Sequence, residues 1–481
     1  MKTKRYISVT IIILTVFSLA QYSCEDYLDV PEEGKIPEGY IQEVSADDAF
    51  KFVSACYAGL RKFGISVFAY MGMFEITSDD ALKGSTPEDN PAQKAMDEFT
   101  YTPNNEHIEL FWNDHYAVIG NCNYAVNQIS SLPMRITTAQ NALVAEARFL
   151  RAYLYFKLNL VFGGVPLVDT TLAAEEFAKI SRSTVEQTYD FIEEDLEFAA
   201  DHLPLSYSFD EAGRATSGAA KTLLARVHMF QNEWAWVQQL TDEVIQSGIY
   251  LLYPNFYNMF RVAGENTSGS IFELQCTSID QGKYKCEYGF VQGPRNNFAK
   301  LQGWGFKIPS PDLISFFDSR NDSVRKAATV LYRGSSTPEG DSIDVKCPNE
   351  VYNHKVYTQI KYNTVDYALD HNIRFIRFAD VLLMSAEAAI HVGGDVSGPL
   401  NEVRDRVDLD PIASPGLQDV WDERRAEFAL EEHRFFDLIR TGRAGAVLGP
   451  LGFVTGKHEV FPLPQNQMDL SNGVLTQNPG Y

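Results

Sequence analysis

Apolar residues recur every three or four positions along most of the chain, and this spacing predicts an α-helical protein. The first clear case begins at Ser45, which suits an N-cap, continues through Phe50, Val53 and Tyr57, and ends at Gly64. The same spacing predicts helices in residues 108–133, 137–166, 183–204, 215–232, 232–248, 374–394, 398–407 and 418–442.

The central helices have a repeat-like character. Residues 137–166 carry leucines on one stripe and alanines or aromatic residues elsewhere, so we expect this helix to be buried on several sides. A helix rich in small residues, 215–232, is followed by one that begins near Trp234 and Trp236, which is typical of a tetratricopeptide-type pair. The spacing is irregular, so the sequence predicts a mainly α, degenerate tetratricopeptide-like scaffold with long irregular loop and small-strand insertions.

Residues 250–372 interrupt the helical pattern. Gly, Asn, Asp, Pro and aromatic residues dominate there, and only residues 309–318 have a helical pattern. Long loops on a rigid scaffold are where binding residues concentrate, so this insertion is the first place to look for a ligand site.

The N-terminus has the composition of a signal peptide. Three basic residues precede an apolar run that spans residues 7–20, and Ser23 then precedes Cys24. We expect residues 1–23 to be removed, Cys24 to be acylated, residues 24–43 to act as a tether, and residues 44–481 to form one domain. The alternative is an ordinary secreted protein in which Cys24 is a plain thiol.

The net charge and the cysteine content limit the possible partners and cross-links of the chain. The net charge is −23, which disfavours nucleic acid as a partner. The other five cysteines are too sparse for a disulfide framework, although Cys276 and Cys286 are close enough to bridge a loop; both the bridged and the free states stay open.

Specific catalytic signatures are missing from the sequence. It has no HExxH, GxSxG, GxxxxGK[ST], CxxC or GxGxxG, and its nine histidines lack metal-ligand spacing, so we expect no metal, cofactor or catalytic residue. Charged residues alternate in sign through residues 418–442, where helical spacing predicts one charged face on a single helix. We interpret Arg424, Glu427, Glu431, Arg434 and Asp437 as a structural ion-pair network; a glycosidase acid/base pair is the alternative.

Six blocks stand out in order along the chain: EARFLRAYLYFKLNLVFGGVPLV, GRATSGAAKTLLARVHMF, GWGFKIPSPDLISFF, IRFADVLLMSAEA, ERRAEFALEEHRFFDLIRTG and LTQNPGY. Together they resemble the SusD/RagB family of outer-membrane lipoproteins. One departure is Glu432, where the family usually has Gly, and the helical pattern puts this residue on an exposed face.

The resemblance implies a fold, a location and partners. It implies a helical body with four tetratricopeptide-like pairs, held by a lipid on the outer face of the outer membrane. It also implies binding of an oligosaccharide or polysaccharide and its delivery to a SusC-like TonB-dependent barrel. The alternatives are a glycoside hydrolase and a helical-repeat importer component that binds a protein or peptide.

Sugars require flat aromatic platforms and a few polar side chains. Two loop regions qualify: residues 77–94 offer polar groups in a turn-rich stretch, and residues 281–306 offer aromatic rings with polar groups. The segment from Tyr284 to Trp304 is our predicted main platform, because the glycines beside Trp304 should leave its faces unshielded. The alternatives are purely structural roles: a core aromatic for Trp304, a turn or N-cap for Asp79 and Asp80, and an ion pair for Arg377. The candidate ligand-binding residues are Trp304, Tyr284, Tyr288, Arg295, Asp79, Asp80, Lys83 and Arg377, with Ser85 nearby.

Overall fold

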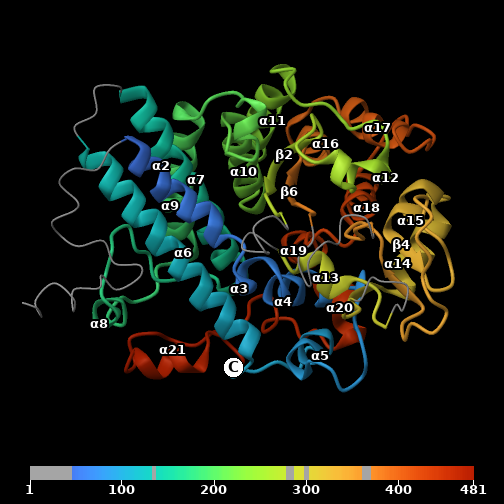
Figure 1. Cartoon of the computed structure of the whole chain (residues 1–481), viewed down its shortest axis with the longest axis horizontal. Helices are drawn as coiled ribbons and strands as arrows, with labels where there is room; N and C mark the ends of the chain where they lie inside the picture. The colour runs from blue at the N-terminus through green and yellow to red at the C-terminus, as the bar shows by residue number, and fades with distance from the viewer. Residues whose placement is uncertain (1–45, 133–136, 278–285, 297–302, 360–369) are drawn as a thin grey trace, which may run out of the picture. The chain divides into compact units, whose positions relative to one another are not determined.

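Helices dominate the computed structural model, which describes residues 46–132, 137–277, 286–296, 303–359 and 370–481 (Figure 1). The first half contains α2 (Ala46–Gly59), α3 (Phe63–Ser66), α4 (Phe68–Met71), the π-helix η2 (Gly72–Ile76), α5 (Pro91–Asp97), α6 (Glu106–Ser131), α7 (Thr137–Phe162), α8 (Ala174–Phe177), α9 (Val185–His202), α10 (Ser217–Phe230) and α11 (Trp234–Gln246). The second half adds α12 (Phe256–Met259), α13 (Tyr288–Gln292), α14 (Pro311–Ser319), α15 (Ser323–Thr329), α16 (Phe378–Val392), α17 (Ser397–Asp405), α18 (Leu417–Phe428), α19 (Arg434–Arg440), α20 (Ala444–Leu448) and α21 (Gln465–Leu470).

Successive long helices pack against one another. α6 contacts α7, α7 contacts α9, and the series continues through α10 and α11 to α16; Figure 1 shows α6, α7 and α9 side by side. Leu150, Leu154 and Leu158 of α7 are fully buried, as the leucine stripe predicts. The mainly helical class is therefore confirmed, whereas the tetratricopeptide-like pairing stays a prediction.

Local chemistry fixes where these helices begin. α9 opens with a capping box, in which Thr184 Oγ1 accepts the backbone N–H of Gln187 at 3.1 Å and Gln187 Oε1 accepts that of Thr184 at 2.9 Å. Thr216 caps α10 in the same manner through the N–H of Ala219 at 3.1 Å. These caps are the polar residues that the sequence places before each apolar stripe.

Three antiparallel pairs of strands accompany the helices. β1 (Ala81–Gly84) pairs with β3 (Phe306–Pro309), with Leu82 opposite Ile308. β2 (Ser270–Leu274) pairs with β6 (Ile373–Arg377), and β4 (Val330–Tyr332) pairs with β5 (Val351–Asn353). Four of these strands, β2 to β5, fall within the irregular region 250–372, and β6 follows directly after it.

The predicted start of the helix over residues 374–394 is wrong. Ile373–Arg377 forms β6 rather than the first turn of a helix, and α16 begins at Phe378. Isoleucine and phenylalanine fit either structure, and pairing with β2 decides between them. α15 was not predicted either; it begins after Asp322, whose carboxylate accepts the N–H of Arg325 at 3.1 Å.

The single helix predicted over residues 418–442 is also wrong, because the chain breaks between α18 and α19. Leu430 and Glu432 have positive φ values of 64° and 62°, outside the helical range. The buried carboxylate of Glu75 accepts their two backbone N–H groups at 3.1 and 2.7 Å and so fixes this turn. Burial, together with nearby Asp80, holds the pKa of Glu75 well above its usual value.

Glu432 is buried rather than exposed, which corrects the sequence interpretation. Its positive φ explains why a glycine suits the position, since glycine adopts this conformation without steric cost. The carboxylate pairs with Lys307, which is fully buried, and accepts the Tyr288 hydroxyl at 2.7 and 2.8 Å. A favourable buried ion pair therefore offsets backbone strain.

Replacing Glu432 by Gly is expected to lower the free energy of unfolding by about 2 kcal/mol. Loss of the carboxylate strands the Lys307 ammonium, at a cost of about 3 to 5 kcal/mol, whereas glycine relieves about 1 to 2 kcal/mol of backbone strain. Chemical denaturation measures the change. Adding Lys307→Met should restore most of the lost stability, and a single variant as stable as the parent would contradict the ion pair.

The remaining cysteines are buried, free thiols: Cys56, Cys122, Cys276, Cys286 and Cys347. Cys276 and Cys286 lie within hydrogen-bonding contact of each other, and this contact lowers the pKa of Cys286. Cys24 lies outside the described residues. Within those residues, no helix has the length and apolar character needed to span a bilayer.

Candidate functional site

The two loop regions singled out in the sequence come together in space. The β1–β3 pair joins them, and the N–H of Ser85 donates to the carbonyl of Gly305 at 2.6 Å. Arg295 Nη1 donates to Ser85 Oγ at 2.8 Å and forms an ion pair with Asp89. Lys83 Nζ completes the turn by donating to the Asp89 carbonyl at 2.8 Å. Arg295 and Lys83 thus hold the loop that borders the predicted platform.

The glycines around Trp304 permit close backbone contacts. A Cβ on Gly303 would lie 2.1 Å from the carbonyl oxygen of Gly293, and Gly305 adopts a φ of 75°. Gly305 donates its N–H to that same carbonyl at 2.9 Å. The two glycines therefore let the backbone of residues 303–305 pack closely against residues 293–295, and Trp304 lies between them.

Trp304 is half-buried and has one covered face. Its ring stacks on Phe68, with centroids 5.9 Å apart and planes inclined by 18°, and Phe290 meets it edge-on at 5.8 Å. The expectation that neighbouring glycines leave both faces unshielded is therefore wrong for one face. The face toward Phe68 is therefore closed to a sugar. Tyr284 lies outside the described residues.

Asp79 and Asp80 bind arginines of the C-terminal helices. Arg434 forms a bidentate pair with Asp79 at 2.7 and 2.8 Å, and Arg425 Nε reaches Asp80 at 2.7 Å. Burial opposes the charge on Asp79, but Arg434 and Arg425 outweigh it and lower its pKa; burial raises the pKa of Asp80. Both side chains are buried, so the structure favours a structural interpretation over ligand binding.

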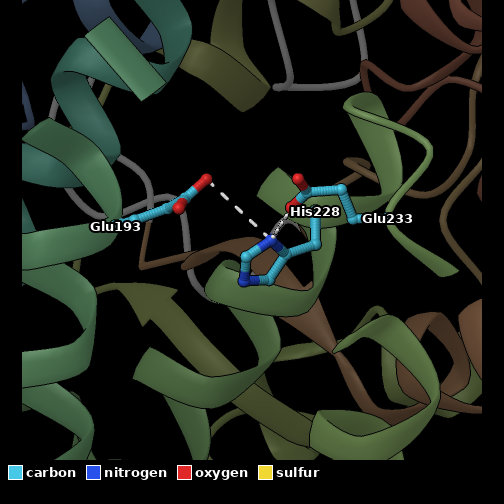
Figure 2. Close-up of side chains that lie close together, drawn as sticks. All are labelled: Glu193, His228 and Glu233. Atoms are coloured by element: carbon cyan, nitrogen blue, oxygen red, sulfur yellow. Dashed lines mark hydrogen bonds and ion pairs between the residues drawn. The ribbon is translucent and has the colours of Figure 1, made fainter. Parts of the chain in front are cut away.

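One group of metal-ligating side chains comes together among the described residues. His228 Nδ1 lies 2.6 Å from a carboxylate oxygen of Glu233 and 3.9 Å from one of Glu193 (Figure 2). The sequence analysis missed this group, because Glu193 lies on a different helix from His228 and no fixed spacing relates them. Only helix packing brings them together.

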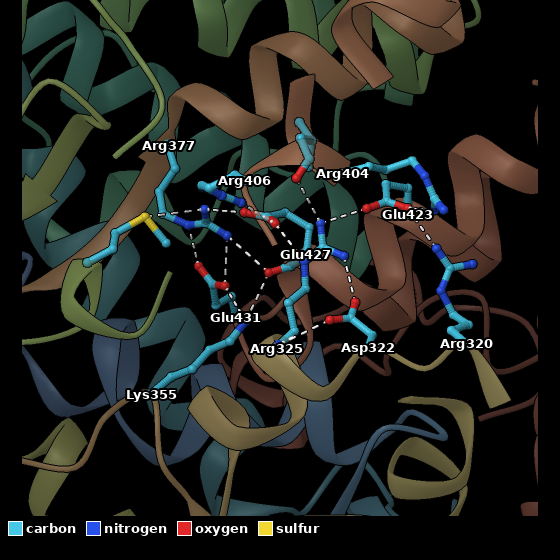
Figure 3. Close-up of polar contacts among 12 residues, drawn as sticks. Arg320, Asp322, Arg325, Lys355, Arg377, Arg404, Arg406, Glu423, Glu427 and Glu431 are labelled. Carbon is cyan, nitrogen blue, oxygen red and sulfur yellow. Dashed lines mark hydrogen bonds and ion pairs between the residues drawn. The ribbon is translucent and has the colours of Figure 1, made fainter. Parts of the chain in front are cut away.

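Arg377 belongs to a buried ion-pair network centred on Glu427. This carboxylate accepts Arg377 Nη1 at 2.7 Å, Arg406 Nη2 at 2.5 Å and Arg325 Nε at 3.1 Å (Figure 3). Arg377 also binds Glu431 at 2.7 Å through Nε. Arg377 therefore makes a structural contact, and so does Tyr288 through its buried bonds to Glu432.

Glu423 forms a second centre of the same network. Its oxygens accept Arg325 Nη2 at 2.6 Å, Arg320 Nη2 at 2.7 Å and Arg404 Nη1 at 2.8 Å. The five residues that the sequence analysis interpreted as an ion-pair network do form ion pairs, on both sides of a helix break. Apart from the pair of Arg424 with Asp437, their partners lie outside the predicted set. Each carboxylate is matched by guanidinium groups, as buried charges require.

The cavities near this network are small. One, lined by Trp421 and several arginines, has a volume of about 10 Å³, and another, beside Tyr70 and Lys157, about 40 Å³. By this measure one water molecule needs about 10 to 15 Å³, so the first cavity is at the limit for one water, the second holds a few, and neither accommodates a sugar ring.

Two sequence families match long segments of the chain. Residues 27–229 match the family described as "Starch-binding associating with outer membrane", and residues 324–456 match the SusD family. The chain belongs to the SusD/RagB family. The Glu432 segment lies within the second of these matches.

Individual members of the SusD/RagB family align along most of the chain. A SusD-like protein of Formosa agariphila is 26% identical over 526 residues and covers 100% of both chains. The starch-binding protein SusD of Bacteroides thetaiotaomicron is 24% identical over 483 residues, with 85% of this chain and 84% of that protein covered.

Solved structures of the family share this fold. A laminarin-binding SusD-like protein superposes with a TM-score of 0.81 at 27% identity, covering 91% of this chain and 100% of its own. Surface glycan-binding protein A from Bacteroides thetaiotaomicron, in complex with laminarihexaose, gives 0.78 at 22% identity, with 90% and 99% covered.

Proposed function

We propose that this protein is a non-catalytic glycan-binding lipoprotein of the outer-membrane surface. The observation that carries the proposal is the likeness to a laminarin-binding SusD-like protein along nearly the full length of both chains. The family description, which names starch binding and association with the outer membrane, supports the same class of ligand and the same location.

The Trp304 region is the ligand surface that we propose. It combines a half-buried aromatic ring with the partly exposed Arg295, beside a turn that the buried Lys83 ammonium holds through the Asp89 carbonyl. Flat rings stack on the CH faces of sugars, and flanking polar groups orient the hydroxyls. Arg295 is 30% exposed and so retains some surface for a ligand.

Calorimetry with laminarihexaose and maltohexaose tests this function, because relatives are described as binding laminarin or starch. Saturable binding of either sugar, with no change in its length after incubation, supports a binder. Shortened products would indicate a hydrolase. Binding to a peptide library, with none to a glycan array, would favour the protein-binding alternative.

Acylation of Cys24 is part of this proposal, and replacing Cys24 by Ala should abolish it. A basic segment, an apolar run and Ser23 precede the cysteine, in the order that lipoprotein processing requires. Cells grown with a fatty-acid analogue should label the parent protein and not the variant. Equal labelling of both proteins would refute the lipid anchor.

A TonB-dependent barrel is the expected partner, because a surface binder without catalytic groups requires a transporter to receive its ligand. A stable complex of this kind buries about 2,000 Å² or more. Gentle detergent extraction of the native protein, followed by mass spectrometry, should recover a barrel in stoichiometric amount. Recovery of the monomer alone would contradict the partnership.

A further inference from the structure

Glu193, His228 and Glu233 form a cluster that is separate from the Trp304 region. Glu193 lies in α9, His228 in the last turn of α10, and Glu233 at the N-cap of α11. One ligand atom from each lies within 4.8 Å of the other two, and in Figure 2 both carboxylates approach the same side of the imidazole.

The surroundings hold these side chains in place. The His228 side chain is only 7% exposed, and the Trp236 ring stacks on it with centroids 5.9 Å apart. Gln231 Nε2 donates to Glu193 Oε1 at 2.5 Å, so this carboxylate is also oriented. Glu233 is half-exposed, which leaves one side of the cluster open to solvent.

The local charge favours a cation. Glu193 and Glu233 place two carboxylates around one imidazole, with one ligand atom from each within 4.8 Å of the other. Charged carboxylates this close repel each other, and a bound cation would relieve that repulsion.

We propose that this cluster binds one divalent transition-metal ion, for which Zn²⁺ is the appropriate probe. Imidazole nitrogen with two carboxylate oxygens suits zinc better than calcium or magnesium, which prefer oxygen ligands alone. Tetrahedral zinc with bonds of about 2.0 to 2.2 Å places its ligands about 3.3 to 3.5 Å apart. The observed separations of 2.6 and 3.9 Å fall on either side of that value.

Metal binding at Nδ1 requires the neutral imidazole to carry its single proton on Nε2. The proton that Nδ1 donates to Glu233 in the metal-free tautomer therefore moves to Nε2 through solvent, and no proton is gained or lost. Solvent fills the fourth position. The ion then links α9, α10 and the start of α11, so it should stabilise the folded state by binding it selectively.

The test uses the tag-free mature protein after treatment with a chelator. Calorimetry should show saturable binding of one Zn²⁺, and added Zn²⁺ should raise the melting temperature by several degrees. Both effects should be absent in His228→Asn. In Glu193→Gln the affinity for Zn²⁺ should fall at least tenfold. The matched control is Glu197→Gln, an exposed glutamate one turn further along α9, which should respond like the parent.

Two outcomes would overturn the proposal. The first is the absence of saturable Zn²⁺ binding to the parent protein, and the second is equal binding by His228→Asn, which would place the ion elsewhere on the acidic surface. The melting temperatures of the metal-free variants show whether each is folded. If His228→Asn is unfolded, Glu193→Gln alone decides, and unchanged affinity in that variant refutes the site.

Discussion

Replacing Glu427 by Gln should lower the free energy of unfolding by about 3 to 5 kcal/mol, because it leaves buried cations without their partner. Three arginines, Arg325, Arg377 and Arg406, donate to this fully buried carboxylate. The amide that replaces it is neutral and directs N–H groups toward guanidinium groups. Chemical denaturation of the parent and variant measures the loss.

Glu98→Gln is the matched control for this prediction. The Glu98 side chain is 54% exposed and lies 3.8 Å from Lys94, so its loss should cost less than about 0.5 kcal/mol. If the two variants lose the same amount of stability, the network around Glu427 does not contribute as the geometry implies.

The pH dependence of stability provides a second measurement of the same network. Burial opposes the charge on Glu427, but Arg406, Arg377 and Arg325 outweigh it and hold its pKa well below the usual value. A lowered folded-state pKa gives stability that is complete above the unfolded-state pKa of about 4.3 and is lost as the pH falls toward the folded-state value. In the Glu427→Gln variant, this part of the decrease in the free energy of unfolding at low pH should be absent.

Trp304→Ala should weaken glycan binding by about 30-fold or more, which corresponds to about 2 kcal/mol, as for other central aromatic residues of binding sites. The ring is half-buried and stacks on Phe68. Its removal should therefore cost less stability than the 3 to 5 kcal/mol lost with a fully buried tryptophan. Calorimetry with the bound oligosaccharide and a melting curve on the same sample measure both effects.

Trp236→Ala is the control for that experiment, because Trp236 is 52% exposed and lies on α11, outside the proposed ligand surface. It should bind the oligosaccharide like the parent. A large drop in melting temperature for Trp304→Ala, with affinity retained by the folded fraction, would show that Trp304 supports the loop and that the sugar binds elsewhere.

Much of the candidate site could be located from the sequence, but the roles of its residues could not. The loops that contain Lys83, Arg295 and Trp304 were predicted as a ligand region, and they do pack together through β1 and β3. Asp79 and Arg377 have the same residue types that contact sugars, yet arginine and glutamate partners from distant segments bind them. Residue type alone does not distinguish a buried ion pair from a ligand contact.

The sequence by itself determined the helical class, most boundaries of the long helices and the position of the irregular region, because periodicity and caps are local properties. Tertiary packing decided the remaining helix ends and the pairing of the strands. Glu75 terminates α18 by accepting the N–H of Glu432, 357 positions away, and β2 converts residues 373–377 from a predicted helix into a strand. Such contacts have no signal in the local pattern, since a buried carboxylate or an unpaired strand edge takes whichever partner the tertiary fold brings to it.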